Sequence, residues 1–167
     1  AGSVLTTGAT VSFGDPILFG ATFRNTAQPA FLSTNSVIDS NVTGASLTAT
    51  VDFDTEIFDQ ASNFASDTFT APITGRYILG SQLDITGLTS SHTNGIIAIV
   101  TSNRTYRLLA CNLGAILRAT NNDVGISSSV LADMDSGDTA TVTVTIINGT
   151  QVVDLDTACK MWGALIT

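Results

Sequence analysis

The sequence predicts an all-β protein, folded as a ten-stranded antiparallel jelly-roll sandwich. Short segments alternate between apolar and polar residues, and turn signals separate them about every 8 to 15 residues. No stretch repeats its apolar residues with the period of a helix. Of the 14 acidic residues Glu56 is the only Glu, and Asp favours turns and strand ends whereas Glu favours helices. Many short strands without helices are typical of a β-sandwich.

Composition narrows the class of protein. A chain of 167 residues forms one domain with at most a short appendage, and it is long enough to bury a core. Apolar residues make up 44% and charged residues 12%, which excludes a disordered chain. The formal net charge is −8 with only six Lys and Arg residues, so we expect no nucleic-acid partner. We also expect neither membrane insertion nor a signal peptide.

The chain divides near residue 28. Residues 1–27 are rich in Gly, Thr and Ser, include an Asp15-Pro16 pair, and are expected to form an N-terminal arm or the end of a stalk. Residues 28–167 are expected to form the jelly-roll domain. Its first strands are predicted at 28–33 and, with a clear apolar alternation, at 47–53.

The stretch 51–85 carries the strongest local signal. Pro72 has no N–H to donate to a strand ladder, and Gly75 follows where the backbone can reverse, so a turn is predicted between two strands. From Tyr77 to Ile85 the apolar residues alternate with polar ones, as in a strand buried on one side.

The second half predicts further strands and two tight turns. Asp135–Asp138 is a turn, and Asn148-Gly149 is a strong hairpin signal. The last segment is nearly all apolar and predicts a central strand covered on both faces. The strands are predicted at residues 96–100, 106–110, 124–131, 139–147, 152–155 and 161–166.

Cysteine usage indicates no disulfide-dependent scaffold. Cys111 and Cys159 are the only cysteines, and their spacing matches no zinc motif. One disulfide is an alternative in an oxidising compartment, but free buried thiols are favoured, because Cys is often a small core residue.

Five segments occur in an order that resembles the globular-head domain of the C1q and tumour-necrosis-factor-like superfamily. They cover about residues 28–166, and their order and spacing carry the resemblance. The family's early Ala-Phe strand, its F-T-x-P-x-x-G-x-Y segment, its late Gly-Asp turn and its terminal strand all have counterparts here. The segments read PAFLSTNS, ATVDFDTEIFDQASNF, DTFTAPITGRYILGSQL, VLADMDSGDTATVTV and KMWGALI.

The resemblance implies a ten-stranded jelly roll that assembles as a homotrimer at the end of a fibrous stalk, with recognition on exposed loops. Trp162 stands where the family usually has Phe, and no collagen-like Gly-x-y stalk precedes the domain. The absence of collagen and the Thr/Asn-rich surface are closer to the domains of phage and bacterial fibres, which predicts a location on a virion or another extracellular surface. A mean hydropathy of +0.35 independently favours a trimer, because one copy cannot easily cover its apolar strands.

The candidate ligand-binding residues lie in three polar loops, at residues 86–94, 102–104 and 121–123. They are His92, Asn94, Asn103, Arg104, Asn121 and Asp123.

Enzyme activity is not expected. His92 is the only His, and a loop imidazole without a second His, Cys or Glu nearby is expected to be an exposed polar residue. A Ser-His-Asp triad can be drawn with so many Ser and Asp residues, but no Gly-x-Ser-x-Gly nucleophile elbow is present.

Two pairs of carboxylates leave open whether the protein binds a metal ion. Asp52 with Asp54, and Asp154 with Asp156, place two acids on one face of a strand, which suits Ca²⁺ or a glycosidase but more often marks a solvated face. The segment 133–138 imitates the start of an EF-hand, but Val144 stands where a bidentate Glu is required. We expect no cofactor, with Ca²⁺ as the alternative.

Two hypotheses of function remain. In the first, the protein is the trimeric tip of a fibre or virion spike that attaches to a host receptor, either a cell-surface glycan or a protein. In the second, it is a capsid decoration or cementing protein that trimerises on a shell, with residues 1–27 as its anchor. Specific binding to cells favours the first, and binding only to assembled shells favours the second.

Overall fold

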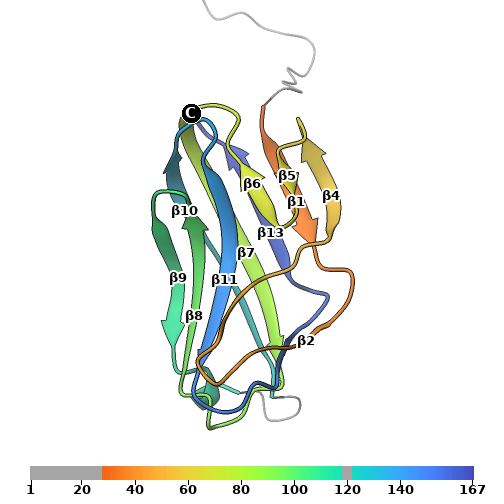
Figure 1. Cartoon of the computed structure of the whole chain (residues 1–167), viewed down its shortest axis with the longest axis vertical. Coiled ribbons are helices and arrows are strands. Elements are labelled where there is room, and N and C mark those ends of the chain that lie inside the picture. The colour runs from red at the N-terminus through yellow and green to blue at the C-terminus, as the bar shows by residue number, and fades with distance from the viewer. Residues whose placement is uncertain (1–27, 118–121) are drawn as a thin grey trace, which may run out of the picture.

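The computed structural model describes residues 28–117 and 122–167, which form two antiparallel β-sheets packed face to face (Figure 1). The larger sheet has the order β2-β12-β7-β13-β1-β4, and β10 pairs with the other edge of β7. The smaller sheet has the order β5-β6-β11-β8-β9, and β3 also pairs with β11. The strands of the larger sheet are β1 (Ala30–Thr34), β2 (Asp39–Thr43), β4 (Thr55–Gln60), β7 (Gly75–Thr86), β10 (Val124–Met134), β12 (Val153–Leu155) and β13 (Lys160–Leu165). Those of the smaller sheet are β3 (Thr48–Thr50), β5 (Phe64–Ala65), β6 (Thr68–Thr70), β8 (Asn94–Thr101), β9 (Thr105–Cys111) and β11 (Thr139–Ile147), and a 3-10 turn, η1 (Leu113–Ala115), follows β9.

The predicted all-β jelly roll is confirmed, although the strands divide more finely than predicted. The strand predicted at 47–53 is reduced to β3, because its end is held by other contacts. Val51 N–H still donates to the Val142 carbonyl of β11 at 3.0 Å, but Phe53 N–H donates to the Asp67 carboxylate at 2.7 Å instead of to a neighbouring strand. Short pieces such as β3, β5 and β6 bring the described strands to thirteen.

β7 is the strand on which the larger sheet is assembled. It pairs along one edge with β10 and along the other with β13 and then β12. The predicted alternation is confirmed, since Tyr77, Leu79, Leu83 and Ile85 all face the core and are at most 1% exposed. A 12-residue strand with three neighbours fixes the register of the whole sheet.

The hairpin predicted at Asn148-Gly149 does not form. Both residues have the positive φ that a tight hairpin turn needs, 63° and 65°. However, β11 belongs to the smaller sheet, whereas the next strand, β12, pairs with β2 and β7 in the larger one. The turn therefore carries the chain across the sandwich, which local sequence cannot distinguish from a hairpin.

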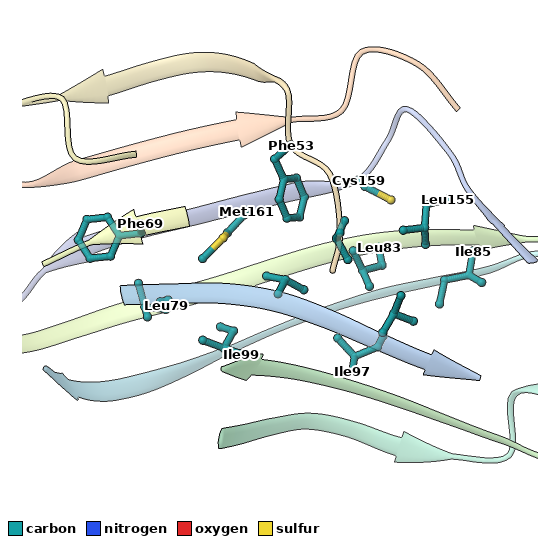
Figure 2. Packing of buried hydrophobic residues seen from close by; sticks show 14 of the residues in the cluster. Phe53, Phe69, Leu79, Leu83, Ile85, Ile97, Ile99, Leu155, Cys159 and Met161 are labelled. Carbon is teal, nitrogen blue, oxygen red and sulfur yellow. The ribbon is translucent and has the colours of Figure 1, made fainter. Parts of the chain in front are cut away.

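The core lies between the two sheets (Figure 2). At one end Phe31 stacks on Phe64 and on Phe69, each with ring centroids 4.8 Å apart, and Phe69 meets Tyr77 edge to face at 5.3 Å. The buried Tyr77 hydroxyl donates to the Ile73 carbonyl at 2.7 Å, which satisfies its polar group. This aromatic cluster fixes the turn that follows β6.

We predict that Gly163→Ala destabilises the fold by about 1 to 3 kcal/mol, because the core has no room for a methyl group there. A Cβ atom at Gly163 would lie 2.6 Å from a Leu79 methyl carbon and 2.6 Å from the Phe31 ring. Urea unfolding measures the change. Gly125→Ala is the control, since its Cβ would meet only one atom, at 4.0 Å. Equal midpoints for the two variants would contradict the prediction.

Candidate functional site

The described part of the chain presents surfaces for interaction and no enclosed site. No pocket opens in residues 28–117 and 122–167, and no group of three or more His, Cys, Asp or Glu residues there is placed to hold a metal ion. No helix within those ranges is long and apolar enough to cross a membrane. The candidates are therefore the two ends of the sandwich and the outer faces of its sheets.

The structure separates the predicted loop residues into two groups. The β7–β8 end, defined here as loops 87–93, 112–117 and 148–152, lies at the bottom of Figure 1. The β8–β9 end, defined as turns 71–74, 102–104 and 135–138, lies at the top with the C-terminus. The nine residues of β11 span the distance between the ends, about 27 Å. His92, Asn94 and Asp123 therefore belong to one end, and Asn103 and Arg104 belong to the other.

The expectation that His92 is exposed is wrong, because its side chain is fully buried. Its Nδ1 accepts a hydrogen bond from the Thr89 backbone N–H at 2.9 Å, and its Nε2 lies 3.0 Å from the Thr150 carbonyl oxygen. With Nδ1 as acceptor, Nε2 carries the proton and donates to that carbonyl. The imidazole also packs on Gly149, where a Cβ would lie 2.3 Å from the ring. His92 therefore joins two loops.

The other residues predicted at the β7–β8 end are partly buried. Asn94 is the first residue of β8, opposite Ile147, and Asp123 directly precedes β10. Asn121 lies outside the described residues.

At the β8–β9 end, Asn103 has a structural role. Its side-chain amide donates to the Asp138 carboxylate at 2.7 Å, and the same carboxylate oxygen accepts the Asp135 backbone N–H at 2.8 Å. Asn103 therefore ties the 102–104 turn to the 135–138 turn. Arg104 is exposed, and its backbone closes the turn through hydrogen bonds with Thr101.

The outer face of the larger sheet carries two apolar rows. In one row Phe58, Leu32 and Trp162 lie opposite one another on β4, β1 and β13. In the next, Ala30, Ala164, Ile78 and Leu131 run from β1 across β13 and β7 to β10. These seven residues are called here the outer apolar face: Ala30, Leu32, Phe58, Ile78, Leu131, Trp162 and Ala164.

Residues 28–117 and 122–167 leave the outer apolar face uncovered. Leu131 is 57% exposed, Phe58 49% and Ile78 38%, and Trp162 is half-buried. The indole lies against Gly80, where a Cβ would come within 2.5 Å of three of its atoms, so Gly80 lets the ring lie flat on the sheet. The alternation predicted within β7 placed Ile78 on the polar side. The face becomes visible only when the register of β4, β1, β13, β7 and β10 is known.

The free β10 edge, with which no described strand pairs, borders this face, and its Asp133 N–H donates to the Tyr106 hydroxyl at 3.4 Å. β10 pairs with β7 on one side, and among the described strands none pairs with its other side. Its sequence, VGISSSVLADM, has Asp133 as the only charge along eleven residues. Long uncharged edges are usually covered, because their backbone groups attract another strand or surface.

An acidic flank lies on the side of β2 and the segment between β3 and β4. Burial raises the pKa of the Asp39 carboxyl, and Asp54 and Asp67 raise it further by charge repulsion. Burial likewise raises the pKa of Asp52, together with repulsion from Asp67 and a hydrogen bond to it. The pKa of Asp54 is instead lowered, because the Ser36 hydroxyl donates to its carboxylate at 2.6 Å. At neutral pH the carboxylates of Asp39 and Asp52 are therefore repelled by their acidic neighbours, which disfavours their charged forms.

The second acid pair is engaged in backbone contacts. Asp154 accepts the Asn41 N–H at 2.6 Å, and Asp156 accepts the Thr157 N–H at 2.6 Å. Ca²⁺ binding stays a prediction.

Both cysteines are free thiols, as predicted. Cys159 is buried beside Asp84, and burial raises its pKa to about 11, so it is unreactive as a thiolate at neutral pH. Cys111 is half-buried at the end of β9.

Comparison with known proteins shows the fold. No family model and no curated protein matches this sequence. The globular domain of zebrafish complement 1qA matches with a TM-score of 0.56 at 15% identity, over 84% of this chain and 98% of that one. Murine APRIL at pH 8.0 matches with a TM-score of 0.56 at 14% identity, over 83% and 99%. The protein therefore has a C1q/TNF-like jelly-roll fold, as the resemblance predicted.

We predict that His92→Ala destabilises the protein by about 2 to 4 kcal/mol. The substitution leaves a cavity, and the Thr89 N–H and the Thr150 carbonyl lose their hydrogen-bond partner. Thermal and urea unfolding measure the loss. Ser91→Ala, at the exposed neighbouring position, is expected to change little. A His92→Ala variant as stable as Ser91→Ala would show that the imidazole does not hold the loops.

We predict that Asp52→Asn raises the free energy of unfolding at pH 7 by up to about 0.5 kcal/mol, a small value because the site is exposed. The raised pKa values of Asp39 and Asp52 mean that the folded state binds their protons more tightly than the unfolded state. Their stabilising contribution is therefore complete below the ordinary value of 3.8 and is lost as pH rises through the raised folded values.

Urea unfolding across pH tests this sign, with the advantage of Asp52→Asn expected to vanish near about pH 3. Asp133→Asn makes the same charge change outside the flank and is the control. An Asp52→Asn variant less stable than the wild type at pH 7 would contradict the prediction.

Proposed function

We propose that this domain is a non-enzymatic, homotrimeric recognition head on a fibre or virion surface, and that it attaches to a receptor on a host cell. The observation that carries the proposal is the outer apolar face, which residues 28–117 and 122–167 of one copy leave uncovered. Contiguous apolar patches on soluble proteins mark interaction sites. Polar rows flank the patch, with Gln82, Lys160 and Ser127 on one side and Arg76 and Asp133 on the other, so it has the polar rim of an interface.

The free β10 edge supplies the second half of such a contact. A face and an edge are different surfaces, so their pairing between copies is heterologous and closes into a ring when the rotation permits. Leu131 belongs both to β10 and to the outer apolar face, so the two surfaces are continuous. A ring of three is the assembly that the C1q and tumour-necrosis-factor resemblance implies, and it covers both surfaces of every copy.

The structural role of His92, the only histidine in the sequence, supports a non-enzymatic function. His92 is enclosed and occupied at both nitrogens, so it is not available as a general base.

The position of Gln28, the first described residue, supports attachment of the domain to its fibre at the β8–β9 end. Gln28 donates from its side chain to the Leu165 carbonyl at 2.8 Å and accepts from Gln60 at 2.8 Å. Thr167 lies at the same end, where its carbonyl accepts the Arg76 N–H. Residues 1–27, proposed as the arm, would therefore connect there, and the β7–β8 end would face away from the fibre.

We predict that Phe58→Asp breaks the trimer, because three carboxylates would be buried in an apolar contact. Light scattering is expected to give three times 17.3 kDa for the wild type and 17.3 kDa for the variant. Leu47→Asp is the control, since Leu47 is similarly exposed, at 44%, but lies off the outer apolar face. A Phe58→Asp variant with the wild-type mass would contradict the interface.

Binding to host cells tests the recognition role directly. Labelled wild-type trimer is expected to bind cells, and Phe58→Asp to bind far more weakly because avidity is lost. Trimers that bind only assembled shells would replace this proposal with the decoration role.

A further inference from the structure

We infer that the β7–β8 end binds uncharged oligosaccharides, through an exposed surface of hydroxyl and amide side chains. The inference rests on the proposed recognition role and names its ligand class and its location. It excludes Arg104 and the rest of the β8–β9 end from the binding surface.

Three loops are joined into one surface at this end. The Gly114 N–H donates to the His92 carbonyl at 3.0 Å, and the His92 ring donates to the Thr150 carbonyl at 3.0 Å. Next to them, the Ala45 N–H donates to the Asn148 carbonyl at 2.9 Å. Loops that follow three different strands therefore form one continuous end of the sandwich (Figure 1).

The loops are also closely packed. A Cβ at Gly114 would lie 2.6 Å from the His92 carbonyl oxygen and 2.8 Å from that of Thr89. Gly149 adopts φ +65° directly against the His92 ring. Binding to this surface would thus cost little loop ordering, which matters for ligands that form few contacts.

The three loops are uncharged, and Asp123, at the same end, lies partly buried just outside them. Loops 87–93, 112–117 and 148–152 contain no Lys, Arg, Asp or Glu, whereas the β8–β9 end carries Arg104, Asp135 and Asp138. A sialylated or sulfated sugar would find no cation on these loops and would meet a chain with a formal net charge of −8. Anionic ligands are therefore disfavoured.

The exposed side chains suit sugar hydroxyls. Hydroxyl and amide groups both donate and accept hydrogen bonds, as sugar hydroxyls do. Most exposed side chains of the three loops are of these kinds, among them Ser90, Ser91, Asn112, Thr150 and Gln151. Since no pocket opens in the described residues, each contact would be shallow and weak, and three copies would supply avidity.

A protein partner fits this surface less well. Protein interfaces draw most of their energy from buried Trp, Tyr and Arg anchors. None of these occurs in the three loops, and their exposed large apolar residues are Ile116 and Val152 alone. The observations therefore favour a glycan.

Wild-type trimer on an array of neutral, sialylated and sulfated oligosaccharides with matched cores tests the inference. We expect binding to neutral members, little changed by salt, since no ion pair forms. Ser90→Glu combined with Asn112→Ala is expected to weaken this binding at least about tenfold. Thr105→Glu places the same charge at the start of β9, which belongs to the β8–β9 end. Thr105→Glu and Arg104→Ala, each tested alone, are expected to leave binding within about twofold of the wild type. Light scattering confirms that each variant keeps the wild-type mass.

Several outcomes would overturn the inference while the recognition role stands. They are binding only to sialylated or sulfated members, loss of binding in Arg104→Ala with retention in the loop variant, and cell binding that survives enzymatic removal of the cells' glycans. Trimer that binds neither cells nor any oligosaccharide would overturn the recognition role and, with it, this inference.

Discussion

The larger sheet has two apolar faces, and the described residues of one copy cover only one of them. The inner face packs on the smaller sheet through residues such as Leu79, Leu83 and Met161, which are at most 1% exposed. The outer face presents Phe58, Trp162 and Leu131 to solvent in neighbouring rows. Removing such surface from water is worth about 25 cal/mol per Å², so a neighbouring copy that covers it gains stability without any change of fold. The account of assembly, orientation and recognition depends on this unequal coverage.

In the proposed trimer, coverage of that face also determines which surfaces remain for a ligand. With the outer apolar face and the β10 edge used between copies, the two ends of the sandwich and the outer face of the smaller sheet remain exposed. The chain enters at the β8–β9 end, where Gln28 is held by the Leu165 carbonyl. The opposite end, organised around His92, is then the surface that a fibre would present.

Local signals in the sequence predicted most of the fold. The alternations in Tyr77–Ile85 and Thr139–Ile147 were read correctly because side-chain direction in a strand depends only on neighbouring positions. Features that depend on distant partners could not be read in this way. Asn148-Gly149 has hairpin geometry, but the sheet that receives the next strand is set by β7 and β2. His92 is polar and lies in a polar loop, yet its burial depends on Thr150, 58 residues away. The candidate ligand residues were likewise taken from loops that the fold places at opposite ends.

Trp162 provides the most direct measurement of whether the outer apolar face is covered, because it is the only Trp in the chain. Acrylamide quenching of its fluorescence reports how accessible the indole is in solution. The account predicts a shielded, blue-shifted indole at micromolar concentrations that becomes accessible when Phe58→Asp separates the copies. An indole equally accessible in the wild type and in this variant, at every concentration, would contradict the claim that other copies cover this face.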